Sequence, residues 1–158
     1  MALLVAVGLI LFVFESHVPR PLPWMKLGLG NLAVLLALVL YGSWAALVVV
    51  SVKVFLGSLF VGSFLGPAFF LAAGGGIVSA GTMGLVHYLW RRYFSVVGIS
   101  ILGAVSHNLI QLILAYLLFV KQVELLFLLP VFLISGLVTG GLVGLLAHWI
   151  LIRKAFFL

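Results

Sequence analysis

Long apolar runs recur along the chain, separated by short polar or glycine-containing breaks. The first run extends from Ala2 to Phe14 and ends at a polar stretch that holds three of the five prolines, Glu15 to Lys26. Because a helix that crosses a bilayer needs roughly 20 apolar residues, the pattern predicts an all-α integral membrane protein. We expect a six-transmembrane-helix bundle in a single membrane domain, 1–158, with helices at about 2–15, 27–41, 44–60, 67–90, 96–120 and 125–152.

The composition supports a membrane location. Hydrophobic residues make up 66% of the chain and charged residues only 6%. A soluble domain is typically about 45–50% apolar and about 25% charged, so a water-soluble fold is excluded. We expect membrane lipid to cover most of the surface, and the length leaves no room for a separate soluble domain.

Basic residues at the ends of the predicted helices indicate an orientation, because positive charges favour the cytoplasmic side. An even number of helices places both termini on one side of the membrane. That side collects Arg91, Arg92, Arg153 and Lys154, and the opposite side collects Arg20, Lys26 and Lys121. The sequence therefore predicts a multi-pass protein of the cytoplasmic membrane with both termini in the cytoplasm.

The scarcity of acidic residues excludes several kinds of chemistry. Glu15 and Glu124 are the two acidic residues of the chain, which has no aspartate and no cysteine. Enzymes that bind Mg²⁺ or Ca²⁺ need clustered carboxylates, and thiol or Cys-type metal chemistry needs cysteine. We therefore expect no enzyme activity, no metal and no cofactor. The net charge of +6 is interpreted as membrane topology and anion attraction, and no nucleic acid is expected as a partner.

Four polar residues fall inside predicted membrane helices, where such groups are expensive and mark function by default. They are Lys53 on the third helix and His107, Asn108 and Gln111 on the fifth. His107 and Gln111 are four residues apart and share a helix face, and Asn108 and Gln111 are three apart. The alternative for each residue is structural: a lysine can extend to the headgroups, and amides can bond neighbouring helices.

In the predicted topology these groups converge on the outer half of the bundle, beneath the proline-rich stretch. That arrangement is typical of a ligand pocket with a lid. The candidate substrate-binding residues are Lys26, Asn31, Lys53, His107, Asn108 and Gln111. The candidate lid residues are Glu15, His17 and Arg20.

Lys53 needs a counter-charge, because burying an ammonium group alone is costly. Its own helix has no carboxylate. One interpretation is that an anionic ligand supplies the charge, and the other is that Glu15 does. The sequence alone leaves both interpretations open.

Glycines recur on two predicted helices. On the fourth helix a small face consists of Gly74-Gly75-Gly76 with Ser79, Ala80 and Gly81. Gly136, Gly140 and Gly144 occupy every fourth position of the last helix. Small residues at this spacing let helix backbones approach closely in lipid. We expect these glycines to pack helices within the chain.

Several motifs resemble a known family. They are Lys26-Leu27-Gly28-Leu29-Gly30-Asn31, Gly57-Ser58-Leu59-Phe60, Leu65-Gly66-Pro67-Ala68-Phe69 and Ser106-His107-Asn108-Leu109-Ile110-Gln111-Leu112. Together they are similar to the Gx transporter family, also labelled heptaprenyl diphosphate synthase component I. The resemblance covers almost the whole chain, and Gly30 departs from it where alanine is expected.

The family in turn resembles the substrate-binding S components of energy-coupling-factor (ECF) transporters. That resemblance implies uptake of a small, anionic or amphipathic molecule with a coupling membrane protein and an ATPase pair. It also implies docking of the coupling protein on an Ala-x-x-x-Ala face, which Ala2 and Ala6 match. The alternative is a non-catalytic membrane partner of a polyprenyl synthase in polyprenyl diphosphate or menaquinone biosynthesis. A purely structural subunit is a third class and needs no polar pocket.

Overall fold

The computed structural model describes residues 1–18 and 28–156, with side chains as far as Arg153. Six α-helices follow one another, and no strand occurs among these residues. The expected all-α membrane bundle is confirmed. The helices are α1 Ala2–His17, α2 Gly30–Tyr41, α3 Ser43–Val61, α4 Pro67–Trp90, α5 Val96–Ala115 and α6 Leu129–Phe156. A π-helical turn, η1 Tyr116–Val120, and a 3₁₀ helix, η2 Val123–Leu128, connect α5 to α6.

Helix lengths divide the bundle into two groups. Four apolar segments are long enough to cross a bilayer: Ser43–Val61, Pro67–Trp90, Val96–Val120 and Val123–Arg153. α1 and α2 are shorter, with 16 and 12 residues. At about 1.5 Å per residue, α2 covers only part of a hydrocarbon core of about 30 Å. The chain is therefore membrane-embedded, and α2 is an internal helix of partial depth.

The boundaries differ from the expected ones where local backbone chemistry intervenes. α2 begins at Gly30 rather than near residue 27, after Gly28 takes a left-handed φ of 80° that favours glycine. The expected helix 96–120 loses α geometry at Tyr116, and the chain turns at Lys121, whose φ is 51°. The α-helical part of the last segment starts at Leu129, so that Pro130 lies in a first turn, where its missing N–H is tolerated.

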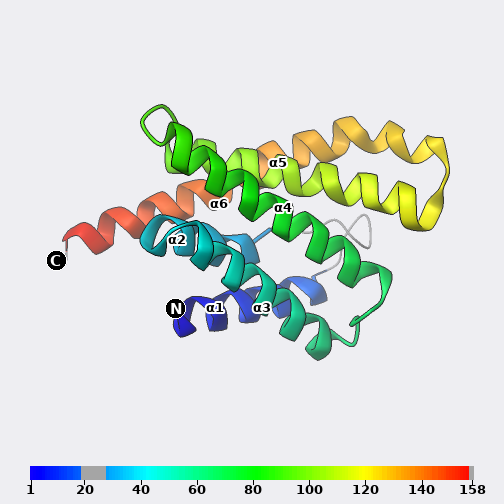
Figure 1. Ribbon diagram of the computed structural model, residues 1–158, viewed down its shortest axis with the longest axis horizontal. Helices are drawn as coiled ribbons and strands as arrows, with labels where there is room; N and C mark the ends of the chain where they lie inside the picture. Colours follow the sequence, from blue (N-terminus) through cyan, green and yellow to red (C-terminus); the bar gives the residue numbers. More distant parts are fainter. Residues whose placement is uncertain (19–27, 157–158) are drawn as a thin grey trace.

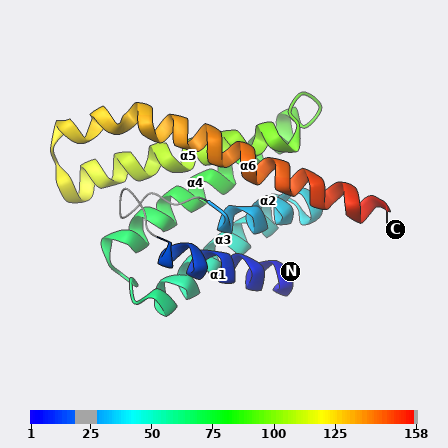
Figure 2. The ribbon, with the colours of Figure 1, turned by 180° about the vertical axis from the view of Figure 1, so that it is seen from behind.

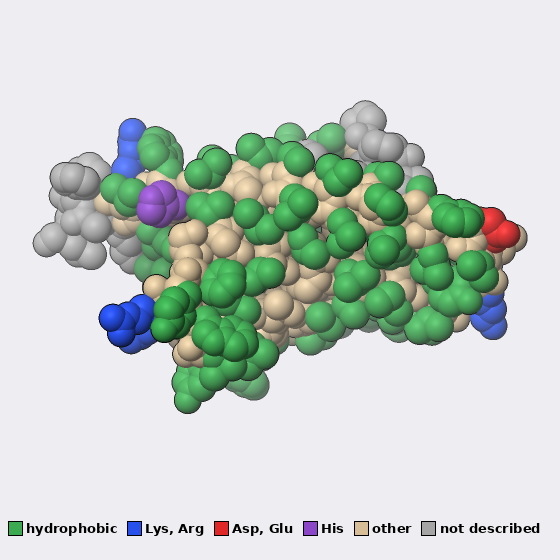
Figure 3. Space-filling model, turned by 90° about the horizontal axis from the view of Figure 1, so that it is seen from above, with side chains coloured by type: hydrophobic (Ala, Val, Ile, Leu, Met, Phe, Trp, Pro, Cys, Tyr) green, Lys and Arg blue, Asp and Glu red, His purple; other side chains and the backbone are tan. Residues whose placement is uncertain are grey.

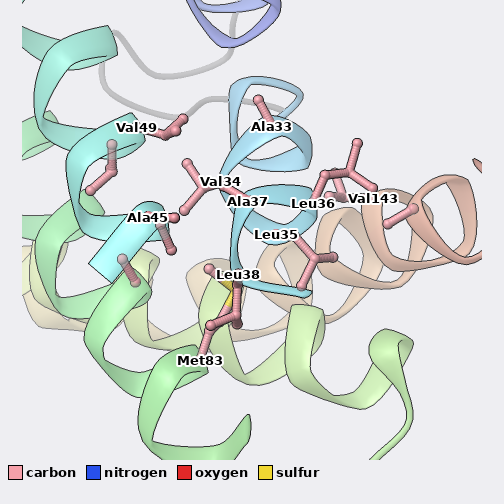
Figure 4. Packing of buried hydrophobic residues seen from close by; sticks show 14 of the residues in the cluster. Ala33, Val34, Leu35, Leu36, Ala37, Leu38, Ala45, Val49, Met83 and Val143 are labelled. Carbon is pink, nitrogen blue, oxygen red and sulfur yellow. The ribbon is translucent and has the colours of Figure 1, made fainter. Parts of the chain in front are cut away.

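α2 forms the centre of the bundle. Its residues 33–38 are all buried, each with at most 7% of the side chain exposed. A helix that is apolar all round is stable only when other elements surround it. Figure 4 shows this arrangement, with Val49 of α3, Met83 of α4 and Val143 of α6 around the side chains of α2.

The remaining helices run roughly along the long axis of the molecule. α5 and α6 form a long antiparallel pair, α4 lies along α5, and α1 packs against α2 and α3 (Figure 1). The view from behind shows both marked termini toward one end of the axis and the α5–α6 connection at the other (Figure 2). Basic side chains lie at both ends, and the surface between them is largely apolar (Figure 3).

Glycines bring α5 and α6 into close contact. A Cβ built at Gly136, Gly140 or Gly144 would lie 3.0, 2.7 and 2.7 Å from the backbone Cα atoms of Val105, Ile101 and Val97. Real Cβ atoms essentially never approach other atoms within 3.0 Å. The expected packing of this glycine face within the chain is confirmed.

Candidate functional site

The end of α1 is tied to the start of α2 by a buried carboxylate. Glu15 lies in the last turn of α1 and is only 2% exposed. Its Oε1 accepts hydrogen bonds from the backbone N–H of Gly28 and, at 3.4 Å, from that of Leu29. These amides precede α2, at the end where helix N–H groups lack partners and the helix dipole is positive. Glu15 therefore ties the last turn of α1 to the two residues that lead into α2.

A buried cation lines the same cavity as Glu15. Lys53, in the middle of α3, is 3% exposed, and its Nζ donates a hydrogen bond of 2.8 Å to Oδ1 of Asn31. Glycines make room for the side chain. A Cβ built at Gly8 would lie 3.6 Å from Lys53 Cδ, and one built at Gly30 would lie 3.3 Å from Nζ. Alanine, expected at Gly30 from the resemblance, would need only a small shift of the flexible lysine end.

Glu15, Asn31 and Lys53 line one small cavity to which α1, α2, α3, α4 and α5 all contribute. Its volume is about 20 Å³, and a single water molecule needs roughly 10–15 Å³. The space among these side chains is therefore about that needed by one water molecule. The other lining residues are Phe12, Gly28, Gly30, Val54, Ala72, Gly76 and His107.

The three polar residues of α5 point to two different neighbours. A Cβ built at Gly75 of α4 would lie 3.0 Å from His107 Cε1 and Nδ1 and from Gln111 Cγ, so these two residues share the face toward α4. Of the three α5 residues, His107 lines the Lys53 cavity. Asn108 instead donates a hydrogen bond of 2.9 Å from Nδ2 to the carbonyl of Phe132 on α6.

Replacing Asn108 by leucine is expected to lower the free energy of unfolding by about 0.5–1.5 kcal/mol, the usual value of one interhelical hydrogen bond. The cavity should keep its shape, because Asn108 does not line it. Equilibrium unfolding in mixed micelles measures the change. A loss of unfolding free energy well above that range would show that Asn108 stabilises the fold through more than this one α5–α6 hydrogen bond.

A second small cavity shares part of its lining with the first. Both cavities are lined by Gly28 and Asn31. The second one, of about 10 Å³, also borders Ser79, Ser100 and Thr139 from α4, α5 and α6. Ser79 is 2% exposed, and its Oγ has no hydrogen-bond partner in the described part of the chain. Asn31 thus links the charged cavity to a region of buried hydroxyl groups.

The sequence indicated Ser79 only as part of a small packing face and did not indicate Ser100, because a small hydroxyl in an apolar helix is as typical of lipid contact as of a buried site. A partial signal exists in the spacing, since Ser79 follows the Gly74–Gly76 run by about one turn. That run also allows close approach to neighbouring helices.

Of the remaining predicted site residues, His17, Ala2 and Ala6 do not line the cavity. His17 is exposed in the last turn of α1, with Nδ1 2.9 Å from the carbonyl of Val13. Ala2 and Ala6 are exposed in the first half of α1. Arg20 and Lys26, predicted as lid and binding residues, fall outside the described residues.

The two acidic residues lie on different elements and do not form a cluster. Glu15 is buried between α1 and α2, and Glu124 is exposed on η2. Within residues 1–18 and 28–156, no three His, Cys, Asp or Glu side chains gather where they could hold a metal ion.

Fold and site together define a small helical membrane protein with a buried, charged cavity at the start of a short central helix. A family model described as heptaprenyl diphosphate synthase component I matches residues 4–150. The protein belongs to this family, which confirms the resemblance expected from the sequence. No curated protein and no solved structure matches the chain.

Proposed function

We propose that this protein is a non-catalytic membrane component that acts with a polyprenyl diphosphate synthase. The observation that carries the proposal is the family match over residues 4–150, whose description is component I of a heptaprenyl diphosphate synthase. A component implies a second polypeptide. The partner would be the subunit that catalyses prenyl transfer.

The acidic residues support a non-catalytic role. Mg²⁺-bound diphosphate needs several carboxylates around the metal. Glu15 already accepts hydrogen bonds from two backbone amides, and Glu124 lies on another element. The chain itself would therefore hold no Mg²⁺–diphosphate complex, and we propose that it is not an enzyme.

Reconstitution of prenyl transfer tests the proposal. We expect the purified chain alone to elongate no prenyl diphosphate. We expect it to raise the rate, or change the product length, of the catalytic subunit in liposomes. The partner role would be contradicted if adding the chain changed neither the rate of the catalytic subunit, nor its product length, nor its association with the membrane. A chain that elongates prenyl diphosphate alone would contradict the non-catalytic one.

A second candidate is a substrate-binding component of an ECF-like uptake system, with a coupling membrane protein and an ATPase pair as partners. The observation that favours it is the buried cluster of Glu15, Asn31 and Lys53, since a purely structural subunit needs no charged cavity. Ala2 and Ala6 are exposed, as a docking face requires. ATP-dependent accumulation of a small anionic or amphipathic molecule in vesicles would support this candidate over the first.

We further propose that the protein resides in the cytoplasmic membrane with both termini in the cytoplasm. The natural absence of cysteine allows a clean labelling experiment with Glu124→Cys and Arg92→Cys, two exposed positions. We expect a membrane-impermeant maleimide to label Cys at position 124 in intact cells and at position 92 only after permeabilisation. The reverse order would invert the orientation, and labelling of both in intact cells would overturn the topology.

A further inference from the structure

The second cavity of the bundle has a polar lining to which four helices contribute. The polar residues around it are Asn31 of α2, Ser79 of α4, Ser100 of α5 and Thr139 of α6. Ser79 and Ser100 are only 2% and 4% exposed. A buried polar group costs free energy unless it is hydrogen-bonded, so the hydrogen bonds of these side chains decide what the cavity holds.

The hydroxyl group of Ser79 lacks a partner among the described residues. Its Oγ is buried and accepts or donates no hydrogen bond within residues 1–18 and 28–156. A Cβ built at Gly103 would lie 3.1 Å from this oxygen, so the hydroxyl group points from α4 toward α5. A buried hydroxyl group left in this state bears the whole cost of its removal from water. Ser79 therefore needs a further hydrogen-bond partner.

Asn31 supplies a hydrogen-bond donor beside the same cavity. Its Oδ1 accepts the hydrogen bond of Lys53, and it must be the oxygen that faces Lys53, because an ammonium group can only donate. The amide nitrogen of Asn31 is therefore the donor that remains for other partners. A Cβ built at Gly28 would lie 3.9 Å from this nitrogen, and Gly28 lines the cavity together with Asn31.

Thr139 supplies a hydrogen-bond acceptor. Its Oγ1 donates a hydrogen bond of 2.8 Å to the carbonyl oxygen of Ser135 on its own helix. The single hydroxyl hydrogen of Thr139 is thereby used, and the lone pairs of the oxygen remain able to accept. The residues around the cavity thus combine the N–H donor of Asn31, the acceptor of Thr139 and the hydroxyl group of Ser79, which can do either.

The size of the cavity and the mixture of donor and acceptor select the ligand. The volume is about 10 Å³, and one water molecule needs roughly 10–15 Å³ and about two to four polar partners. Chloride is larger than water and fits less well. Hard metal cations need oxygen ligands, whereas the Asn31 amide contributes N–H groups and holds the positive charge of Lys53 at its oxygen. Water is the ligand that meets all three conditions.

We propose that this cavity binds one ordered water molecule, which bridges Asn31 of α2 to Ser79 of α4 and Thr139 of α6. The water accepts a hydrogen bond from the Asn31 amide nitrogen, donates one to Thr139 and completes the hydrogen bonding of Ser79. It also keeps the amide oxygen of Asn31 turned toward Lys53, because a flipped amide would place its N–H groups against the ammonium group. The inference concerns the interior of the bundle and is independent of the proposed function.

The sign of the stability change on replacing Ser79 by alanine tests the inference. With the water bound, Ser79→Ala removes one of its partners, so we expect a lower midpoint of equilibrium unfolding in micelles. In a dry cavity the same change would remove an unpaired hydroxyl group and raise the midpoint. Ser51→Ala, at an exposed serine of α3, is the matched control, since alanine itself favours helix. A Ser79→Ala midpoint equal to or above that of Ser51→Ala would overturn the inference.

An experimental structure at a resolution that shows ordered waters tests the site directly. We expect one density peak within hydrogen-bond distance of Asn31 Nδ2 and Ser79 Oγ, and a structure without that peak would overturn the inference. Replacing Na⁺ by choline, or chloride by gluconate, separates water from an ion. The difference between the Ser79→Ala and Ser51→Ala midpoints should be the same in all these salts. A difference that requires sodium or chloride would assign the site to that ion and overturn the assignment to water.

Discussion

Replacing Lys53 by methionine is expected to lower the free energy of unfolding by about 3–5 kcal/mol, the usual cost of removing one member of a set of buried opposite charges. Lys53 and Glu15 are 3% and 2% exposed and line the same cavity. Without the ammonium group, the carboxylate keeps its amide donors but loses the nearby positive charge. We therefore propose Glu15, rather than a ligand, as the counter-charge on which the fold depends.

The double variant Lys53→Met with Glu15→Gln separates the two interpretations. Neutralising both groups should recover most of the lost stability, because coupled sites are strongly non-additive. Lys121→Met, at an exposed lysine, is the control and should be neutral within about 0.5 kcal/mol. Equilibrium unfolding in micelles measures all three. A stable Lys53→Met protein, or a double variant no better than the single one, would show that Glu15 is not the counter-charge.

Replacing Gly140 by valine is expected to destabilise the protein by about 3 kcal/mol, at the upper end for overpacking. A Cβ at this position would lie 2.7 Å from Ile101 Cα and 3.0 Å from the carbonyl oxygen of Ser100. Both are backbone atoms, so no side chain can rotate away. α5 and α6 would have to separate along their contact.

Gly141→Val is the matched control on the next residue of α6. A Cβ there meets no atom within 4 Å, so valine should cost nothing and should gain a little from lower backbone freedom in the unfolded chain. The unfolding midpoints of the two variants, compared at the same detergent concentration, give the result. Equal midpoints would contradict the close packing of α5 on α6.

The sequence was sufficient to predict six helices because each apolar run ends at glycine, proline or charge. The sequence was insufficient to predict that α2 is buried inside the bundle. The twelve residues of α2 are as apolar as those of a membrane span, and their burial within the bundle depends on neighbours that are distant in the chain. The π-helical turn after Ala115 also lacks a local signal, since Tyr116 to Val120 resemble any apolar helix.

The candidate site was predictable in part. Lys53 and Asn31 stood out because polar groups are rare in this chain, and the structure joins them by a hydrogen bond. The spacing of His107 and Gln111 correctly indicated one face. Asn108 was placed with them because a separation of three residues also suggests proximity, but its amide reaches α6. A helix pattern shows which residues are neighbours and not which helix each neighbour meets.

Affinity purification of the tagged protein from native membranes, with its partners identified by mass spectrometry, tests the proposed role most directly. The account predicts recovery of a prenyl diphosphate synthase subunit in a fixed ratio to the chain, and prenyl elongation activity in the eluate. Recovery of a coupling membrane protein with an ATPase pair, and no synthase, would contradict it and establish the uptake role instead.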